Sequence, residues 1–249
     1  IVSAKGGVGK STLTVNLGRA YASMGQRVLL VDLDVSCRTL DMMMGVEDAA
    51  LYDVSDVVCG RVSVERAVVP LPQSDNMFLL AGCVDPAFAL SAASADALMS
   101  RAAQALGADC ILLDTHAPDR TAPPLAATVT DTLVVTTPDA LSVRAAEQCG
   151  VSLSRMGAPR PRLTVNRLDP DAVSSLTLSE MIDLSGLRLI GVVPLDPDMA
   201  QAQAQGKMAK EAARPNTVAA LRNIACRLAG RRVPLLTDWR GVNRRQILR

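Results

Sequence analysis

The segment "SAKGGVGKST", residues 3–12, combines three glycines with two lysines and a Ser-Thr pair. Closely spaced glycines let successive backbone N–H groups turn inward around phosphate oxygens, and a helix beginning near Lys10 adds its positive end. Lys10 would then reach the β- and γ-phosphates of a nucleotide, and Ser11 would offer its hydroxyl to Mg²⁺. The residues of this loop that are expected to bind ATP are Lys5, Gly6, Gly7, Val8, Gly9, Lys10, Ser11 and Thr12.

The loop departs from the usual pattern G-x-x-x-x-G-K-[ST], because Ala4 stands at the first glycine and Lys5 is an additional lysine. "KGGVGKST" resembles the deviant phosphate loop of the MinD/ParA family of ATPases. The resemblance implies that Lys5 crosses the interface of an ATP-bound homodimer and contacts the phosphates of the other subunit. Lys5 and Lys10 are therefore expected to be catalytic, each neutralising charge that develops on a γ-phosphate.

Two aspartates, Asp32 and Asp34, follow an apolar run in "VLLVDLDVSCRTLDMMMG", residues 28–45. They alternate along the expected strand, so their side chains should point in opposite directions. The stretch is similar to the MinD branch of the family, and the similarity implies that Asp34 orients the attacking water while Asp32 supports the Mg²⁺ site. The alternative is that both aspartates only cap the next turn. The residues expected around the metal are Ser11, Asp32 and Asp114.

Asp114 ends the apolar run "CILLDT", at the position of a Walker B aspartate that holds a Mg²⁺-bound water. Relatives typically continue Asp-x-Pro-Ala-Gly, whereas this chain has "DTHAPD", with His116 and Pro118 at the departures. Proline has no N–H to offer a γ-phosphate, so the distinction between ATP and ADP at this loop is in question. His116 is either a neutral loop substitution or a functional group near the phosphates.

Asn166 and Arg167, which are also expected to bind ATP, end a later run, "RLTVNR". The resemblance implies that the Asn166 amide bonds the adenine edge, whereas the plainer alternative is a cap of the following turn. The segment "TTPDALSVRAAEQ" resembles the entry to the helix where MinD regulators dock. Ala145 and Ala146 stand where relatives often have acids, so a regulator that needs those acids would bind poorly.

Apolar runs alternate with helix-like stretches along the chain, which predicts an α/β fold: a single-domain, doubly wound, mostly parallel sheet flanked by helices. The strands are expected at 1–4, 27–34, 77–82, 110–115, 132–137, 162–167 and 189–194. The helices are expected at 11–24, 92–106, 139–156 and 216–229, each followed by a glycine that suits a left-handed cap. The resemblance covers residues 1–236, which we take as the ATPase domain.

The last residues, 237–249, read "TDWRGVNRRQILR" and differ from the rest of the chain. Trp239, Val242 and Ile247 fall on one face of a helical wheel, with the arginines mostly elsewhere. This predicts a basic tail that forms an amphipathic membrane-targeting helix. The alternatives are a disordered basic tail or one that packs on its own domain.

The composition narrows the possible functions further. The net charge of +1 gives no overall attraction to nucleic acid, and no apolar run is long enough to span a bilayer. The six cysteines form no C-x-x-C pair, so they are expected to be reduced, and an iron–sulfur carrier of the same superfamily is not expected.

The resemblance, together with these observations, implies a MinD-like ATPase that dimerises with ATP and Mg²⁺, binds an anionic membrane surface and positions the bacterial division site. A division-inhibitor or activator protein is the expected partner, and nucleic acid is not. The protein is expected in the cytoplasm, peripheral on the inner face of the cell membrane when ATP is bound. One alternative is a ParA-like partition ATPase, which needs basic residues clustered on the folded domain. The other is a weakly hydrolysing or non-hydrolysing regulator of the flagellar-number type.

Overall fold

The computed structural model describes residues 1–34, 37–72, 74–85, 87–115, 125, 128–169, 176–204 and 213–235. His116, Pro118 and the tail at 237–249 lie outside these residues. The chain divides into two compact units, one of residues 1–10, 117–197 and 213–249 (the first unit) and one of residues 11–116 and 198–212 (the second unit). Each unit carries its own sheet, and we describe them separately.

The second unit is built on a four-stranded sheet in the order β2-β3-β1-β4. Its strands are β1 (Val28–Leu33), β2 (Val69–Pro70), β3 (Met77–Leu80) and β4 (Cys110–Thr115). β1 pairs in parallel with β3 and β4, while β2 pairs antiparallel with β3. Every residue of β1 is buried, as expected for a strand covered on both faces. Its helices are α1 (Lys10–Ser23), α2 (Leu40–Met44), α3 (Val54–Val58), α4 (Val64–Ala67) and α5 (Ala92–Leu106).

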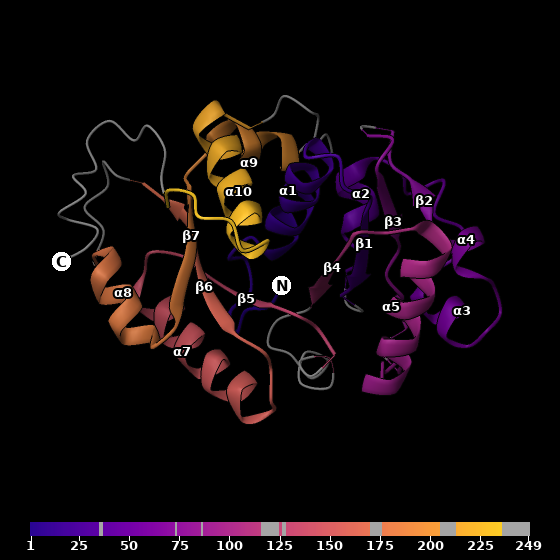
Figure 1. Cartoon of the computed structure of the whole chain (residues 1–249), viewed down its shortest axis with the longest axis horizontal. Coiled ribbons are helices and arrows are strands. Elements are labelled where there is room, and N and C mark those ends of the chain that lie inside the picture. The colour runs from indigo at the N-terminus through magenta and orange to yellow at the C-terminus, as the bar shows by residue number, and fades with distance from the viewer. Residues whose placement is uncertain are drawn as a thin grey trace. The chain divides into compact units, whose positions relative to one another are not determined.

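The first unit contains a parallel three-stranded sheet in the order β5-β6-β7. Its strands are β5 (Thr132–Thr136), β6 (Pro161–Leu168) and β7 (Arg188–Pro194), and its helices are α7 (Ala140–Arg155), α8 (Leu178–Ser185) and α10 (Pro215–Leu228). The short helix α9 (Pro197–Ala204) begins at the boundary between the units. Val143 of α7, Met181 of α8 and Val192 of β7 share one buried core. Gly191 faces Ile224 of α10 instead, because successive strand residues point to opposite faces. In Figure 1, α10 accordingly lies alongside β7, and α7 and α8 cover the other face of the sheet.

The structure confirms the α/β class and most of the expected elements, with one exception. The expected strand at 1–4 is reduced to a single parallel bridge between Val2 and Val134. The four glycines expected after helices, Gly25, Gly107, Gly157 and Gly230, all have left-handed backbone angles. Among the described residues, no helix has the length and apolar character needed to cross a bilayer.

Candidate functional site

The glycine-rich loop lies between the Val2 bridge and the first residue of α1. Gly7 and Gly9 have φ angles of 74° and 94°, which side chains with a Cβ rarely adopt. Lys10 begins α1 and is buried, with 8% of its surface exposed. The loop therefore has the local geometry of a phosphate site, in which a left-handed glycine turn leads directly into a helix N-terminus.

Asn166 and Arg167, at the end of β6, lie against this loop within the first unit. The Asn166 side-chain nitrogen donates a hydrogen bond to the Val8 carbonyl at 2.8 Å, and Asn166 is buried. A Cβ added at Gly9 would clash with that amide and lie 3.9 Å from the Arg167 guanidinium. The structure therefore places the end of β6 against the glycine-rich loop, and in it the Asn166 amide nitrogen bonds the loop backbone.

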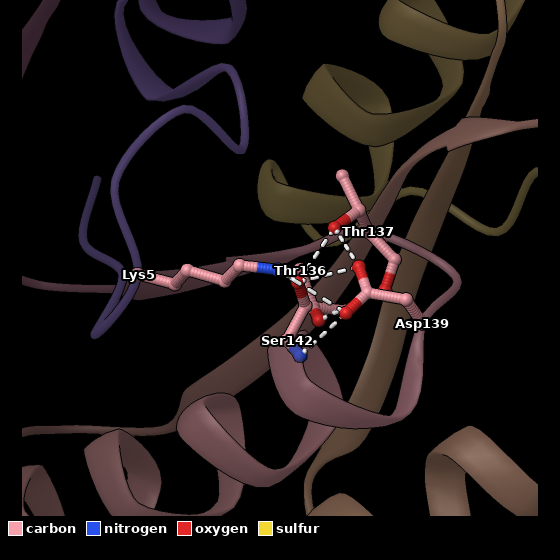
Figure 2. Close-up of polar contacts among 5 residues, drawn as sticks. All are labelled: Lys5, Thr136, Thr137, Asp139 and Ser142. Atoms are coloured by element: carbon pink, nitrogen blue, oxygen red, sulfur yellow. Dashed lines mark hydrogen bonds and ion pairs between the residues drawn. The ribbon is translucent and has the colours of Figure 1, made fainter.

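Lys5, the second lysine of the loop, extends away from the glycine turn to the start of α7 (Figure 2). Its ammonium donates to the Asp139 carboxylate at 3.2 Å and to the Ser142 hydroxyl at 2.8 Å. The Thr137 hydroxyl lies 2.6 Å from the same carboxylate. Asp139 is also the N-cap of α7, accepting from the Ser142 backbone N–H at 2.9 Å. One carboxylate thus binds both the lysine and the helix end.

The hydrogen bonds around Asp139 determine its charge state. Partial burial of the carboxyl raises its pKa, but donors from Ser142, Thr137 and Lys5 outweigh burial and bring the pKa far below its ordinary value. Asp139 is therefore ionised at all physiological pH values. Sequence reasoning did not identify Asp139, Thr137 or Ser142 as partners of Lys5. An aspartate before an apolar helix signals an N-cap, but nothing in its spacing indicates a lysine more than a hundred residues away.

Asp32 and Asp114 meet in the second unit, where they are register partners on β1 and β4. Both are fully buried. The Asp32 carboxylate accepts from the backbone N–H of Asp34 at 2.9 Å and of Leu40 at 3.0 Å. A Cβ on Gly82 would come within 3.0 Å of the Asp32 carboxyl carbon, so a glycine is needed beside it. Asp34 is partly exposed, which agrees with the expectation that the two aspartates point in different directions.

Burial and, to a smaller extent, the charges of Asp114 and Asp34 raise the pKa of Asp32 to about 7, against the lowering effect of its two backbone hydrogen bonds. Asp114 is tied to α1, because the Thr14 hydroxyl donates to its carboxylate at 3.2 Å. Ser11 precedes Thr14 by one turn on the same helix face. The second unit therefore brings Asp32 and Asp114 together, and Ser11 lies one helical turn before Thr14, the hydrogen-bond partner of Asp114.

The outer face of α7 forms a second surface feature, a cavity of about 550 Å³. It is lined by Arg144, Glu147, Gln148, Val151, Ser152, Arg155 and Met156. Ala146 is 1% exposed and packs in the core of the first unit, so an acid at this position could not contact a regulator on the surface. Of the two alanines in the segment, Ala145 is the one that is partly exposed.

Comparison with known proteins gives a consistent result. The model of the CobQ/CobB/MinD/ParA nucleotide binding domain matches residues 1–209. The septum site-determining protein MinD of Bacillus subtilis is 32% identical over 242 residues, covering 94% of this chain and 90% of the relative. A chain of the MinC:MinD cell division protein complex of Aquifex aeolicus superposes with a TM-score of 0.82 at 28% identity, covering 95% and 96% of the two chains. The cell division ATPase MinD of Pyrococcus furiosus superposes with a TM-score of 0.78 at 26% identity, covering 92% and 97%.

Proposed function

The chain belongs to the CobQ/CobB/MinD/ParA family of nucleotide-binding domains and is an ATPase of the MinD/ParA type, and on that premise we propose that it is a MinD-like ATPase of bacterial cell division. It dimerises with ATP and Mg²⁺, binds an anionic membrane surface and positions the division site. Hydrolysis of ATP to ADP and phosphate separates the dimer and releases it from the membrane.

The observation that carries this proposal is the position of Lys5. Its side chain is 43% exposed and extends to Asp139, away from the glycine turn that would hold the protein's own nucleotide. Such a lysine can exchange the Asp139 carboxylate for the γ-phosphate held by a second copy of the chain, and its charge remains neutralised throughout. This exchange makes ATP binding and dimerisation one event.

The residues of the second unit fit a magnesium ion. Mg²⁺ prefers one or two carboxylates together with a hydroxyl, phosphate oxygens and water, and Ser11, Asp32 and Asp114 offer that donor set. Two buried carboxylates side by side repel each other, which is one cause of the raised pKa of Asp32, and a divalent cation relieves this repulsion. When bound, the ion neutralises charge on the phosphate oxygens. Asp34, which is more exposed, orients the attacking water.

The loop and the end of β6 bind the nucleotide in this proposal. Lys10 and the backbone N–H groups of the glycine turn bind the phosphates. Because the Asn166 amide nitrogen already bonds Val8, a contact with adenine would use its carbonyl oxygen. The Arg167 guanidinium, close to Gly9, adds positive charge on the nucleotide side of the first unit.

The membrane and the protein partner complete the proposal. The tail at 237–249, outside the described residues, would supply the amphipathic anchor, and two tails on one dimer would bind more strongly than one. The solved Aquifex complex contains MinC together with MinD. By analogy we assign a division-inhibitor partner to this chain, with the cavity on the outer face of α7 as its docking surface.

ATP turnover and sedimentation with anionic vesicles test the proposal, with the full chain compared to a variant ending at Leu236. Pelleting that requires ATP and is lost on truncation supports the membrane switch and the anchor together. Pelleting without turnover favours the non-hydrolysing alternative. Binding to DNA in place of vesicles would replace the proposal with the partition alternative.

A further inference from the structure

A cluster of arginines lies at the amino ends of β6 and β7 in the first unit. Arg162 and Arg188 are register partners on these neighbouring strands, so their Cα atoms lie side by side. Arg227, near the end of α10, packs close enough to both for their charges to act on it. Residues 162, 188 and 227 are far apart in sequence, and only the sheet and the packing of α10 on β7 bring them together.

Within the part of the chain that the structure describes, the charge of this arginine cluster is only partly neutralised. Arg162 pairs with Asp131 at 3.1 Å. The Nε of Arg227 is buried and has no hydrogen-bond partner among the described residues, while its Nη1 donates to the Val233 carbonyl at 3.2 Å. Burial lowers the pKa of Arg227, and the charges of Arg188 and Arg162 lower it further. Like charges held together at a surface are unfavourable unless an anion compensates for them.

More arginines extend the cluster over the exposed surface. Arg160, directly before β6, is exposed, as is Arg188 at the start of β7. Arg231 and Arg232 follow α10 and are exposed as well. We call these four exposed arginines, together with the two less exposed ones, the basic edge: Arg160, Arg162, Arg188, Arg227, Arg231 and Arg232.

The chain leaves the folded domain beside this basic edge. Val233 is bonded to Arg227, and Leu235 packs against the core of the first unit. The tail that follows carries four arginines and the apolar residues Trp239, Val242 and Ile247. Apolar side chains interspersed with arginines suit a membrane interface, where the apolar groups enter the headgroup boundary, whereas they would add little on a DNA backbone.

We infer that the basic edge of the folded domain is a second membrane contact, which binds the phosphates of anionic lipid headgroups next to the tail. The inference rests on the proposed membrane function and adds to it a contact made by the globular domain itself. Guanidinium groups suit this role because their fork geometry matches phosphate oxygens. The basic edge determines the orientation of the first unit on the bilayer. A tail alone would not determine that orientation.

The test is a double variant, Arg188→Gln with Arg231→Gln, in the full chain. Both side chains are exposed, and neither makes an ion pair with another described residue. The matched control is Arg66→Gln with Arg101→Gln, two exposed arginines of the second unit that give the same change in net charge. Binding is measured with ATP on vesicles of phosphatidylglycerol and phosphatidylethanolamine, and on phosphatidylcholine vesicles for comparison. ATP turnover and ATP-dependent dimerisation are measured in parallel.

Each arginine near an anionic surface contributes to the free energy of membrane binding. Losing two of them should therefore weaken vesicle partitioning at least about tenfold. We expect the double variant to lose vesicle binding to this extent while its ATP turnover and dimerisation stay unchanged. The control variant should bind vesicles as well as the native chain does. If the double variant pellets as well as the control, the basic edge makes no lipid contact, although the proposed function stands. If the native chain binds duplex DNA but not vesicles, both the inference and the membrane proposal are wrong. Native protein that pellets equally on phosphatidylcholine also overturns the inference.

Discussion

Replacing Asp32 with Asn should remove a pH dependence from the stability of the nucleotide-free, metal-free protein. The pKa of this buried carboxyl is raised from 3.8 to about 7. In the folded state it therefore holds its proton to higher pH than in the unfolded state. Its contribution to stability is complete below its ordinary pKa and is lost as the pH rises through about 7.

The magnitude follows from the two pKa values. Integrated between about pH 5 and about pH 8, the linkage predicts that Asp32 makes the native protein about 3 kcal/mol less stable at the higher pH. Asn cannot ionise, so the variant should lack this difference. Asn also offers one acceptor oxygen, whereas Asp32 uses two, for the N–H groups of Asp34 and Leu40. The resulting loss of stability is the same at both pH values, so it cancels in the difference between them.

The assay is urea unfolding at both pH values with a chelator present. The chain has one histidine, so a His116→Gln background removes the other side chain that ordinarily titrates in this range. Asp96→Asn, at an exposed position of α5, is the matched control. If the Asp32 variant and the control lose the same free energy of unfolding between the two pH values, burial does not hold the proton on Asp32, and the argument for a cation beside Asp114 is weakened with it.

Three further predictions concern other parts of the molecule. Lys5→Ala should abolish ATP-dependent dimerisation on size exclusion while leaving some ATP binding, whereas Lys10→Ala should lose most of both; a Lys5 variant that dimerises normally contradicts the role given to this lysine. Asp139→Asn retains an N-cap acceptor but not the charge, so its stability should fall less than that of the native protein as the pH drops below about 4, near the ordinary pKa of the carboxyl. In that range the unfolded native chain takes up a proton at Asp139 while the folded chain keeps the carboxylate ionised, so the stabilisation that the charge provides is progressively lost. An equal fall would show that the network around Asp139 does not lower its pKa. Gly191→Ala should cost about 1–3 kcal/mol in urea unfolding, because the new methyl group meets Ile224, and Ile224→Ala in the same chain should recover part of that loss. A double variant no more stable than expected from independent effects would contradict the contact.

Local sequence features predicted the parts of the fold that depend on local physics. Continuous Val, Leu and Ile runs identified the buried strands, and the glycines after helices were confirmed by their left-handed backbone angles. The run at 1–4 was apolar enough for a strand, but Val2 alone forms a bridge. The short helices α2, α3 and α4 were not predicted, because four or five residues give no helical period to detect.

The site shows the same division. The glycine turn could be recognised from its own local sequence. Asp32 and Asp114 could be recognised because each stands near the end of its own apolar run. Asp139 could not be assigned to Lys5, nor Arg227 to Arg188, since each pairing depends on tertiary packing. The clustering of Arg162 and Arg188 could not be predicted for the same reason, because the sheet register brings these two residues together.

The double role of Asp139 makes Lys5 and α7 mutually dependent. A carboxylate has a limited set of acceptor positions, and here they are shared among an ammonium, two hydroxyls and the first turn of a helix. Any ligand that draws Lys5 away must change the electrostatic environment of that first turn. Suppose that moving Lys5 changes the binding free energy of a protein on α7. Thermodynamic reciprocity then requires that binding of this protein changes the free energy of moving Lys5 by the same amount. In the proposed dimer, binding of a protein on α7 and contact of Lys5 with a second subunit would therefore be thermodynamically coupled.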